Sequence, residues 1–387
     1  MTSVAAVALL LVVQGTESLE ARRDAWAARL ETLRGLRFVR PLRVREGTRV
    51  EYARYALSGA QRLYGGDLEA AGAGLKALGL IPRLLRLDVA ITARAGFGVK
   101  CWVDGGELVL LDRTAGDDWV LNKMALGLVE QHHAPAAEAT FDGQMALAAL
   151  RMGDAEIVKY LVVHGGALPK EFAARLRDEA REWETSGSKF ASAVAPRVLV
   201  RTADFPWRRG GAFAAALYAQ GGFAALDRAW ERPPVSTEQI LHPEKYAADE
   251  RPARIGLPTA VDRLKTAGWT FRFRTVLGEL GTALVLETHL PREDHDATAA
   301  GWSGDALAVF EKGEEPPAVI WATAWDTASD AEAFERSAAT LAERAASSEP
   351  PRASRAERRG SKVLLLLQVP PEHVDALRAA AWADLGG

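Results

Sequence analysis

Side chains able to bind a metal ion gather at the end of one predicted helix, at 118–133, and in the segments after it. They are His132, His133, Glu138, Asp142 and Asp154. Imidazole and carboxylate groups are common zinc ligands, so these residues are the first candidates for a metal site. Two adjacent histidines on one helix, however, point about 100° apart, which is poor geometry for chelating one ion. The spacing therefore favours solvated or hydrogen-bonded side chains at these positions.

Two other side chains have reactive potential. Lys123 lies on the same predicted helix, where a desolvated pocket would lower the pKa of its amine enough for a base or a nucleophile. Cys101 is the single cysteine and lies in an apolar segment, which favours a buried structural thiol over a reactive one. The sequence has no Gly-x-Ser-x-Gly elbow, no Gly-x-x-x-x-Gly-Lys-Ser/Thr loop and no Gly-x-Gly-x-x-Gly opening a helix after a strand. None of these motifs therefore supplies a catalytic site.

The composition is typical of a soluble globular protein with a large core. The chain has 387 residues, of which 48% are hydrophobic and 26% are charged. Lysine and arginine (48) nearly balance aspartate and glutamate (51), and no basic stripe with interleaved aromatic residues stands out. We therefore expect no nucleic-acid partner.

An apolar run at Val4–Val13 has the length of the central region of a signal peptide and is too short to span a bilayer. We interpret residues 1–19 as a signal peptide or N-terminal extension. The expected location is outside the cytoplasm, periplasmic or extracellular, with a cytoplasmic protein as the alternative. No segment approaches eighteen uninterrupted apolar residues, so no integral membrane span is expected.

The periodicity of apolar residues predicts a mostly helical first part and an alternating second part. Helices are expected at 17–36, 50–80 with a break at Gly65-Gly66, 118–133, 140–163, 169–184 and 210–231. Extended segments are expected at 90–92, 99–103 and 107–111, the last two joined by an Asp-Gly-Gly turn. The proline-rich segment 232–246 is predicted as an ordered loop with a helical turn at its centre. The second part is predicted as strands at 269–275, 305–311, 317–325 and 362–368, helices at 276–288, 328–346 and 371–384, and a loop at 347–361.

The segment 122–132, Asn-Lys-Met-Ala-Leu-Gly-Leu-Val-Glu-Gln-His, resembles the His-Glu-x-x-His helix of a bacterial gluzincin-like zinc metallopeptidase family. Met152-Gly153-Asp154-Ala155 stands where that family has Glu-Gly-Asp-Ala. The run 233–246, Pro-Pro-Val-Ser-Thr-Glu-Gln-Ile-Leu-His-Pro-Glu-Lys-Tyr, is the most specific shared segment. Shorter marks include Ala95-Gly96-Phe97 and Gly301-Trp302-Ser303-Gly304-Asp305, so the resemblance extends from about residue 50 to the end.

The resemblance implies which residues occupy the zinc site of the family. Asn122 and Leu126 take the places of the two histidines, Lys123 that of the catalytic glutamate and Met152 that of the third ligand. Leucine and methionine offer no hard donor, asparagine is a poor zinc ligand, and an ammonium group repels a dication. We therefore expect no metal, no other cofactor and no zinc-dependent catalysis.

The resemblance also implies the architecture, an α+β fold. A mostly helical gluzincin-like (thermolysin-type) core with a small sheet would occupy 20–255, and a smaller α+β module would occupy 256–387.

Three functions remain open. The first is a noncatalytic pseudoprotease that binds a peptide or protein partner, with the substrate-pairing edge strand of the family corresponding to 107–111 or 99–103. The second is a structural or assembly protein whose cleft is plugged by Leu126 and Met152. The third is an active hydrolase with a relocated site. An open groove lined by Trp183, Trp207 or Tyr246 would favour the first, and a filled cleft would favour the second.

Overall fold

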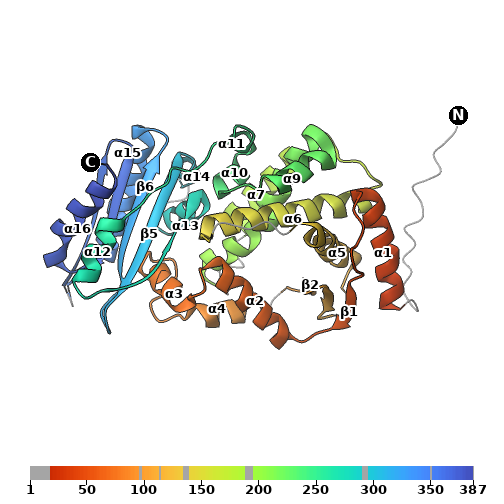
Figure 1. Ribbon diagram of the computed structural model, residues 1–387, viewed down its shortest axis with the longest axis horizontal. Coiled ribbons are helices and arrows are strands. Elements are labelled where there is room, and N and C mark those ends of the chain that lie inside the picture. Colours follow the sequence, from red (N-terminus) through yellow and green to blue (C-terminus); the bar gives the residue numbers. More distant parts are fainter. Residues whose placement is uncertain are drawn as a thin grey trace.

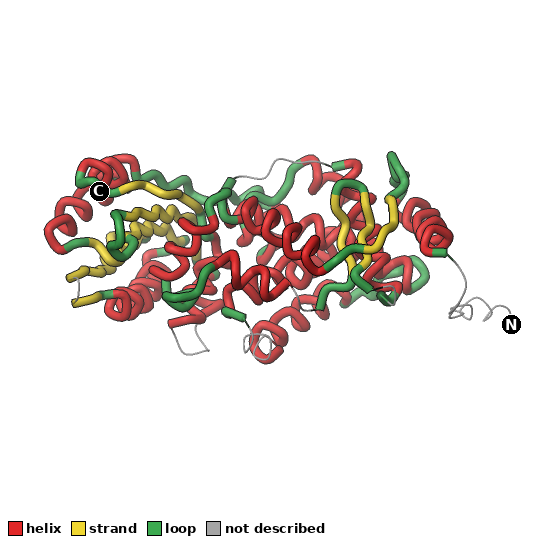
Figure 2. Tube along the Cα trace, turned by 90° about the horizontal axis from the view of Figure 1, so that it is seen from below, coloured by secondary structure: helices red, strands yellow, loops and turns green. Residues whose placement is uncertain are grey.

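The computed structural model describes residues 18–95, 98–112, 115–133, 139–187, 195–289, 295–348 and 351–386. The expected export segment at Val4–Val13 lies outside these ranges, as do Gly96, Phe97 and Glu138. The fold is α+β, as predicted. A six-stranded sheet lies at one end of an elongated molecule and a three-stranded sheet near the other, with helices between them (Figures 1 and 2). No helix among the described residues is long and apolar enough to cross a membrane.

The N-terminal elements confirm the predicted helices and correct one extended segment. The helices are α1 (Leu19–Arg34), α2 (Arg49–Leu63), α3 (Leu68–Ala77) and α4 (Leu87–Ala95). A capping box formed by Thr48 and Glu51 starts α2. Gly65 and Gly66, both at positive φ, separate α2 from α3 as expected. The residues 90–92 lie within α4, so their prediction as extended was wrong: the β-branched pair Ile91-Thr92 was outweighed by the helical context around it.

The three-stranded sheet has the order β1-β3-β2, with β1 at Arg43–Glu46, β2 at Cys101–Asp104 and β3 at Glu107–Leu110. The predicted hairpin between β2 and β3 is confirmed, with the turn at Gly105 and Gly106. The arginine-rich β1 was not expected, and it pairs in parallel with β3. Because β3 is hydrogen-bonded on both sides, 107–111 cannot be an edge strand for a substrate, and that alternative was wrong; β2 is at the edge.

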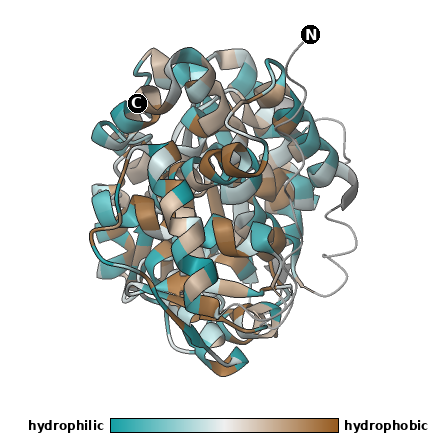
Figure 3. Ribbon diagram, turned by 90° about the vertical axis from the view of Figure 1, so that its right-hand side faces the viewer, coloured by the Kyte–Doolittle hydropathy of each residue, from teal (hydrophilic) through white to brown (hydrophobic). Residues whose placement is uncertain are grey.

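The central helices are α5 (Asp117–His132), α6 (Phe141–Val163), α7 (Phe172–Glu182), a π-helix at Trp183–Gly187, and α9 (Arg197–Glu231). The helices α6 and α9 pack at very close range. A Cβ atom on Gly153 would lie 2.1 Å from the carbonyl oxygen of Gly210, and one on Gly210 would lie 2.2 Å from that of Ala149. Glycine is therefore required at this crossing. Seen from the α1 end, the helices that face the viewer carry both apolar and hydrophilic residues (Figure 3).

One central prediction needed correction. The helix α9 starts at Arg197 and not at 210, because Pro206 and the two glycines after it are accommodated within the helix. Non-helical backbone at Gly221 and Gly222 then kinks α9 before its last turns. The helical turn predicted at the centre of 232–246 is present as α10 (Thr237–Leu241), and a second short helix, α11 (Pro243–Ala247), follows it.

The six-stranded sheet is antiparallel, in the order β4-β5-β6-β9-β8-β7. Its strands are β4 (Thr270–Thr275), β5 (Trp302–Glu311), β6 (Ala318–Trp325), β7 (Ser347–Ser348), β8 (Pro351–Arg359) and β9 (Lys362–Val369). The prediction of a loop at 347–361 was wrong. The strand β8 lies near the edge of the sheet and is mostly half-buried or exposed, so charged residues are tolerated there and hid its strand character.

Helices cover both faces of this sheet. One face packs on α12 (Pro258–Thr266) and α16 (Pro371–Asp384), and the other on α13 (Gly278–His289), with α14 (His295–Ala299), and α15 (Ala328–Ala345). Alternating residues of one strand point to the two faces. Ile320 of β6 belongs to the hydrophobic core under α12 and α16, and Trp321 belongs to the core under α13 and α15. The core under α13 and α15 continues into α3, α6 and α9. It therefore contains residues from both sides of position 255, where the sequence suggested a domain boundary.

Candidate functional site

The positions for which the sequence resemblance predicted a degenerate zinc site face one interface between α5 and α6. Asn122 of α5 donates a hydrogen bond from Nδ2 to Oε2 of Glu156 on α6, over 3.1 Å. Leu126 follows Asn122 by one helical turn, and Met152 precedes Glu156 by one turn, so each pair shares a helix face. Leu126 and Met152 also belong to the same apolar cluster. The structure thus brings the positions 122, 126 and 152 together.

The polar atoms at this interface are few and mostly engaged. Asn122 is fully buried, and its Oδ1 has no hydrogen-bond partner among the described residues. The carboxylate of Glu156 accepts from Asn122 and forms an ion pair with Lys159. Glu156 was not singled out in the sequence, although its spacing of four residues from Met152 places it on the same helix face.

Lys123, which follows Asn122 on α5, brings a positive charge close to this interface. Its Nζ lies 5.5 Å from the ring centroid of Trp207, and Nζ of Lys159 lies 5.2 Å from the same ring. Burial lowers the pKa of Lys123, while Cys101 and Glu156 act in the opposite direction. Cys101 is fully buried, and burial raises the pKa of its thiol to about 11, so it is a structural cysteine here.

The other metal-ligand candidates from the sequence are engaged in separate structural contacts. His132 contacts the carbonyl oxygen of Arg37 through Nε2 over 2.6 Å, and the His133 ring stacks on Trp230 with 4.8 Å between centroids. Asp154 forms a fully buried ion pair with Arg34. Asp142 accepts hydrogen bonds from Thr237, far from these groups in the fold. They therefore do not converge on one site.

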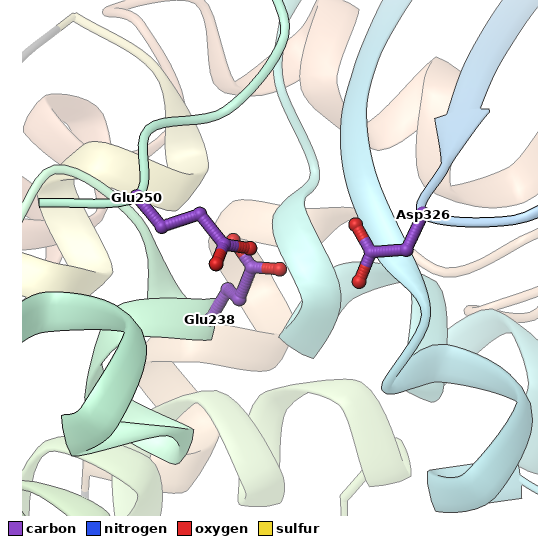
Figure 4. A group of neighbouring side chains, drawn as sticks. All are labelled: Glu238, Glu250 and Asp326. Atoms are coloured by element: carbon purple, nitrogen blue, oxygen red, sulfur yellow. The ribbon is translucent and has the colours of Figure 1, made fainter. Parts of the chain in front are cut away.

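A group of carboxylates with metal-compatible spacing does exist in the described part of the chain. Glu238, Glu250 and Asp326 have oxygen atoms within 4.8 Å of one another (Figure 4). Nζ of Lys245 lies 2.7 Å, 2.9 Å and 2.9 Å from their oxygens. Burial opposes the charge on Lys245, but its hydrogen bonds to Asp326, Glu238 and Glu250 outweigh this effect and raise its pKa. The ammonium group thus takes the place that a cation would need.

A cavity of about 350 Å³ lies between α2, α4, α6 and α9. Its polar lining comes from three arginines, two tyrosines, a glutamine and a threonine, with no carboxylate among the described lining residues: Arg62, Arg94, Arg151, Tyr52, Tyr64, Gln144 and Thr202. The rest of the wall is apolar or small. Arg94 and Arg151 are each paired with a carboxylate outside the lining, Asp204 and Glu130, so the lining offers guanidinium N–H donors whose charge is partly balanced.

The cavity borders the helix that carries the motif positions. Arg151 in its wall forms an ion pair with Glu130 of α5, and Pro206 in its wall precedes Trp207, against which Lys123 packs. The aromatic residues expected around a groove do not line it. Trp183 instead donates to Asp204, and the hydroxyl of the buried Tyr246 donates to the carbonyl of Arg232.

Residues 268–378 match the model of a domain of unknown function (DUF8575). The matched region begins just before β4 and ends within α16, so it covers the six-stranded sheet and not the helices that carry Asn122 and Met152. Neither the curated proteins nor the solved structures contain a match to this chain.

Proposed function

We propose that this chain is a catalytically inactive homologue of gluzincin-like zinc metallopeptidases that acts by binding a peptide or protein partner. The observation that supports it is the α5–α6 interface. The positions 122, 126 and 152 face one another there, and they carry an amide bonded to Glu156, a leucine and a methionine. We include export in the proposal, on the basis of the apolar run Val4–Val13.

A catalytic zinc ion needs three protein ligands and an open position for water. At this interface Oδ1 of Asn122 is the one buried side-chain atom without a hydrogen-bond partner among the described residues, so it is the one atom free to bind a metal ion. Amide oxygens, however, are weak zinc ligands. The carboxylate of Glu156 is shared between Asn122 and Lys159. Lys123 adds a positive charge close by. Binding a dication here would therefore cost both an ion pair and electrostatic repulsion.

The binding proposal depends on the separate cavity between α2, α4, α6 and α9, because no groove lined by Trp183, Trp207 or Tyr246 supports it. Leu126 and Met152 do pack into the apolar cluster at the former metal position, which supports plugging at that point alone. A relocated hydrolytic site has weaker support. Among the described residues the metal-compatible carboxylate group is already occupied by the ammonium group of Lys245, which pairs with all three of its members.

The first experiment measures zinc content and hydrolysis. Purified protein, dialysed against zinc and then against metal-free buffer, should retain far less than about one equivalent and should not cleave casein or a peptide library. Zinc near one equivalent together with cleavage would overturn the proposal.

A restored variant tests whether the alignment is correct. Asn122→His, Lys123→Glu, Leu126→His and Met152→Glu together should create a site that retains about one zinc, because the three ligands would face one another across α5 and α6. The matched control lacks only Met152→Glu and should bind zinc much more weakly. A restored variant that folds but gains no zinc would show that these segments do not correspond to the family motif.

Binding itself is measured by fluorescence anisotropy, with a panel of labelled hexapeptides titrated with folded protein. Saturable binding of intact peptide supports the proposal. Absence of binding across the panel, in protein shown to be folded, counts against it and favours the assembly alternative.

A further inference from the structure

We infer that the cavity between α2, α4, α6 and α9 binds a small organic anion, a carboxylate attached to an apolar chain. The inference rests on the proposed noncatalytic binding function and gives that function a ligand class and a site. It is carried by the shape of the cavity, by the distribution of its cationic groups and by two buried hydroxyl groups.

The shape is that of a channel along helices. The α2 wall runs from Tyr52 through Ala56 to Leu63, twelve residues that span about 16 Å at the rise of an α-helix. The walls from α6 and α9 repeat the pattern, with lining residues one turn apart. No residue of α2 is fully buried, although its inward face is largely apolar. The face therefore lacks a covering layer, which an apolar chain in the channel would supply.

Two guanidinium groups mark one end of the channel. The charge of Arg94 acts on Tyr52 and that of Arg151 on Tyr55, so both arginines lie near the start of α2. Arg94 has an ion pair of 3.6 Å with Asp204, and Arg151 is paired with Glu130. Each guanidinium has five N–H donors, so one ion pair leaves donors available to a ligand. A planar carboxylate is the group that such donors bind best.

Two buried hydroxyl groups lie toward the other end, where Tyr64 stacks on Phe141. Tyr64 and Thr202 are each only 8% exposed and line the cavity. Their hydroxyl groups approach each other, but neither has a partner with hydrogen-bond geometry among the described residues. Buried hydroxyl groups are normally hydrogen-bonded, so a polar atom such as a backbone amide of a short peptide fits here, whereas octanoate would place only its methyl end at this point. Burial raises the pKa of Tyr64 to about 12, so its phenol remains a donor.

This chemistry belongs to two sources, a medium-chain fatty acid and the free C-terminus of a short apolar peptide. Calorimetric titration separates them with octanoate and with N-acetyl-Ala-Leu-Leu as probes. Octanamide and the C-terminal amide of the peptide are the uncharged counterparts. We expect at least one acid to bind with a stoichiometry of one, and its amide to bind about tenfold more weakly or worse.

Arg94→Gln and Arg151→Gln should each weaken the acid about tenfold and leave the amide nearly unchanged, because only the acid uses the charge. Arg175→Gln is the matched control, since that arginine lies on α7, outside the cavity, in an exposed ion pair with Glu179. Ala148→Leu, which fills part of the channel, should weaken acid and amide together. Thermal unfolding of each variant shows whether it is folded.

The inference is overturned if neither acid binds at millimolar concentration, or if both arginine variants bind the acid as tightly as the original chain does. Such a result leaves the proposed function standing, provided that labelled hexapeptides bind without cleavage. Stoichiometric zinc with hydrolysis would refute the proposed function instead, whatever the small acids do.

Discussion

Asp142, buried where the helical part meets the six-stranded sheet, should make the stability of the folded chain depend on pH. Its Oδ1 accepts from the backbone N–H and the hydroxyl of Thr237, over 2.7 Å and 2.6 Å. Burial raises the pKa of Asp142 to about 8, and the nearby Asp305 adds to the increase, whereas the hydrogen bonds from Thr237 lower it. The folded chain therefore holds this proton at neutral pH, and the unfolded chain, with a pKa of about 3.9, has released it.

The sign follows from proton linkage. Between about pH 4 and pH 8 the folded state binds more protons at Asp142 than the unfolded state does, so this group makes the free energy of unfolding fall as pH rises. The slope from one group is at most about 1.4 kcal/mol per pH unit. Asp142→Asn keeps the oxygen that accepts from Thr237 but does not titrate. Relative to the original chain, the variant should gain up to about 4 kcal/mol between pH 5 and pH 8.

The assay is urea unfolding followed by circular dichroism at several pH values from 5 to 8. A stability difference between Asp142→Asn and the original chain that does not change with pH would refute this reasoning, because it would mean that Asp142 is ionised in the folded state.

Asp305→Asn is the contrasting variant. The oxygens of Asp305 accept from two backbone N–H groups and from the indoles of Trp302 and Trp321, so an amide would turn N–H groups toward donors. Burial raises the pKa of Asp305 to about 6, whereas the unfolded group titrates near 3.9. The loss in this variant should therefore shrink between pH 5 and pH 6 and stay constant, at about 3 kcal/mol, from pH 6 to pH 8, where the effect of Asp142→Asn still changes.

Three further variants test the packing and charge arrangements. Gly153→Ala should destabilise the chain by about 3 kcal/mol or more, because its Cβ would lie 2.1 Å from the carbonyl oxygen of Gly210. Denaturant unfolding measures the loss. The control, Gly59→Ala on α2, should cost little because there is space for its Cβ. Arg34→Met should cost about 3–5 kcal/mol by leaving the fully buried Asp154 without its cation, again measured by unfolding. Lys245→Ala should free three carboxylates, so calcium should raise the melting temperature of this variant and leave that of the original chain unchanged; no calcium effect on the variant would show that the group cannot bind an ion.

Long periodic segments were predictable, and elements whose form depends on their neighbours were not. The helix α6 and the strand β6 have regular apolar patterns, so their boundaries were close to those observed. The strands β1 and β8 contain many charged residues, and their pairing with β3 and β9 makes them strands. The helix α9 continues through Pro206 because packing against α6 outweighs the cost of a proline.

Some features of the candidate site were likewise predictable from the sequence, and others were not. A spacing of four residues is enough by itself to place Asn122 and Leu126 on one face of a helix. The hydrogen bond between Asn122 and Glu156 could not be predicted in this way, because it depends on how α5 and α6 cross. The cavity was beyond sequence reasoning altogether, because it exists where α2 is held away from α6. An apolar helix face looks the same in a sequence whether protein or a ligand covers it.

The charges around the motif helix connect the proposed function with the inferred ligand. Lys123 and Lys159 approach one indole, that of Trp207, and Glu156 balances one of the two positive charges. The neighbouring cavity is lined by arginines and by no carboxylate among its described residues. On the proposed ancestry, the loss of a dication has not made the region neutral, because side chains now supply positive charge. A cleft that once polarised a peptide carbonyl through a metal would then attract anions without one, and binding would persist while hydrolysis was lost.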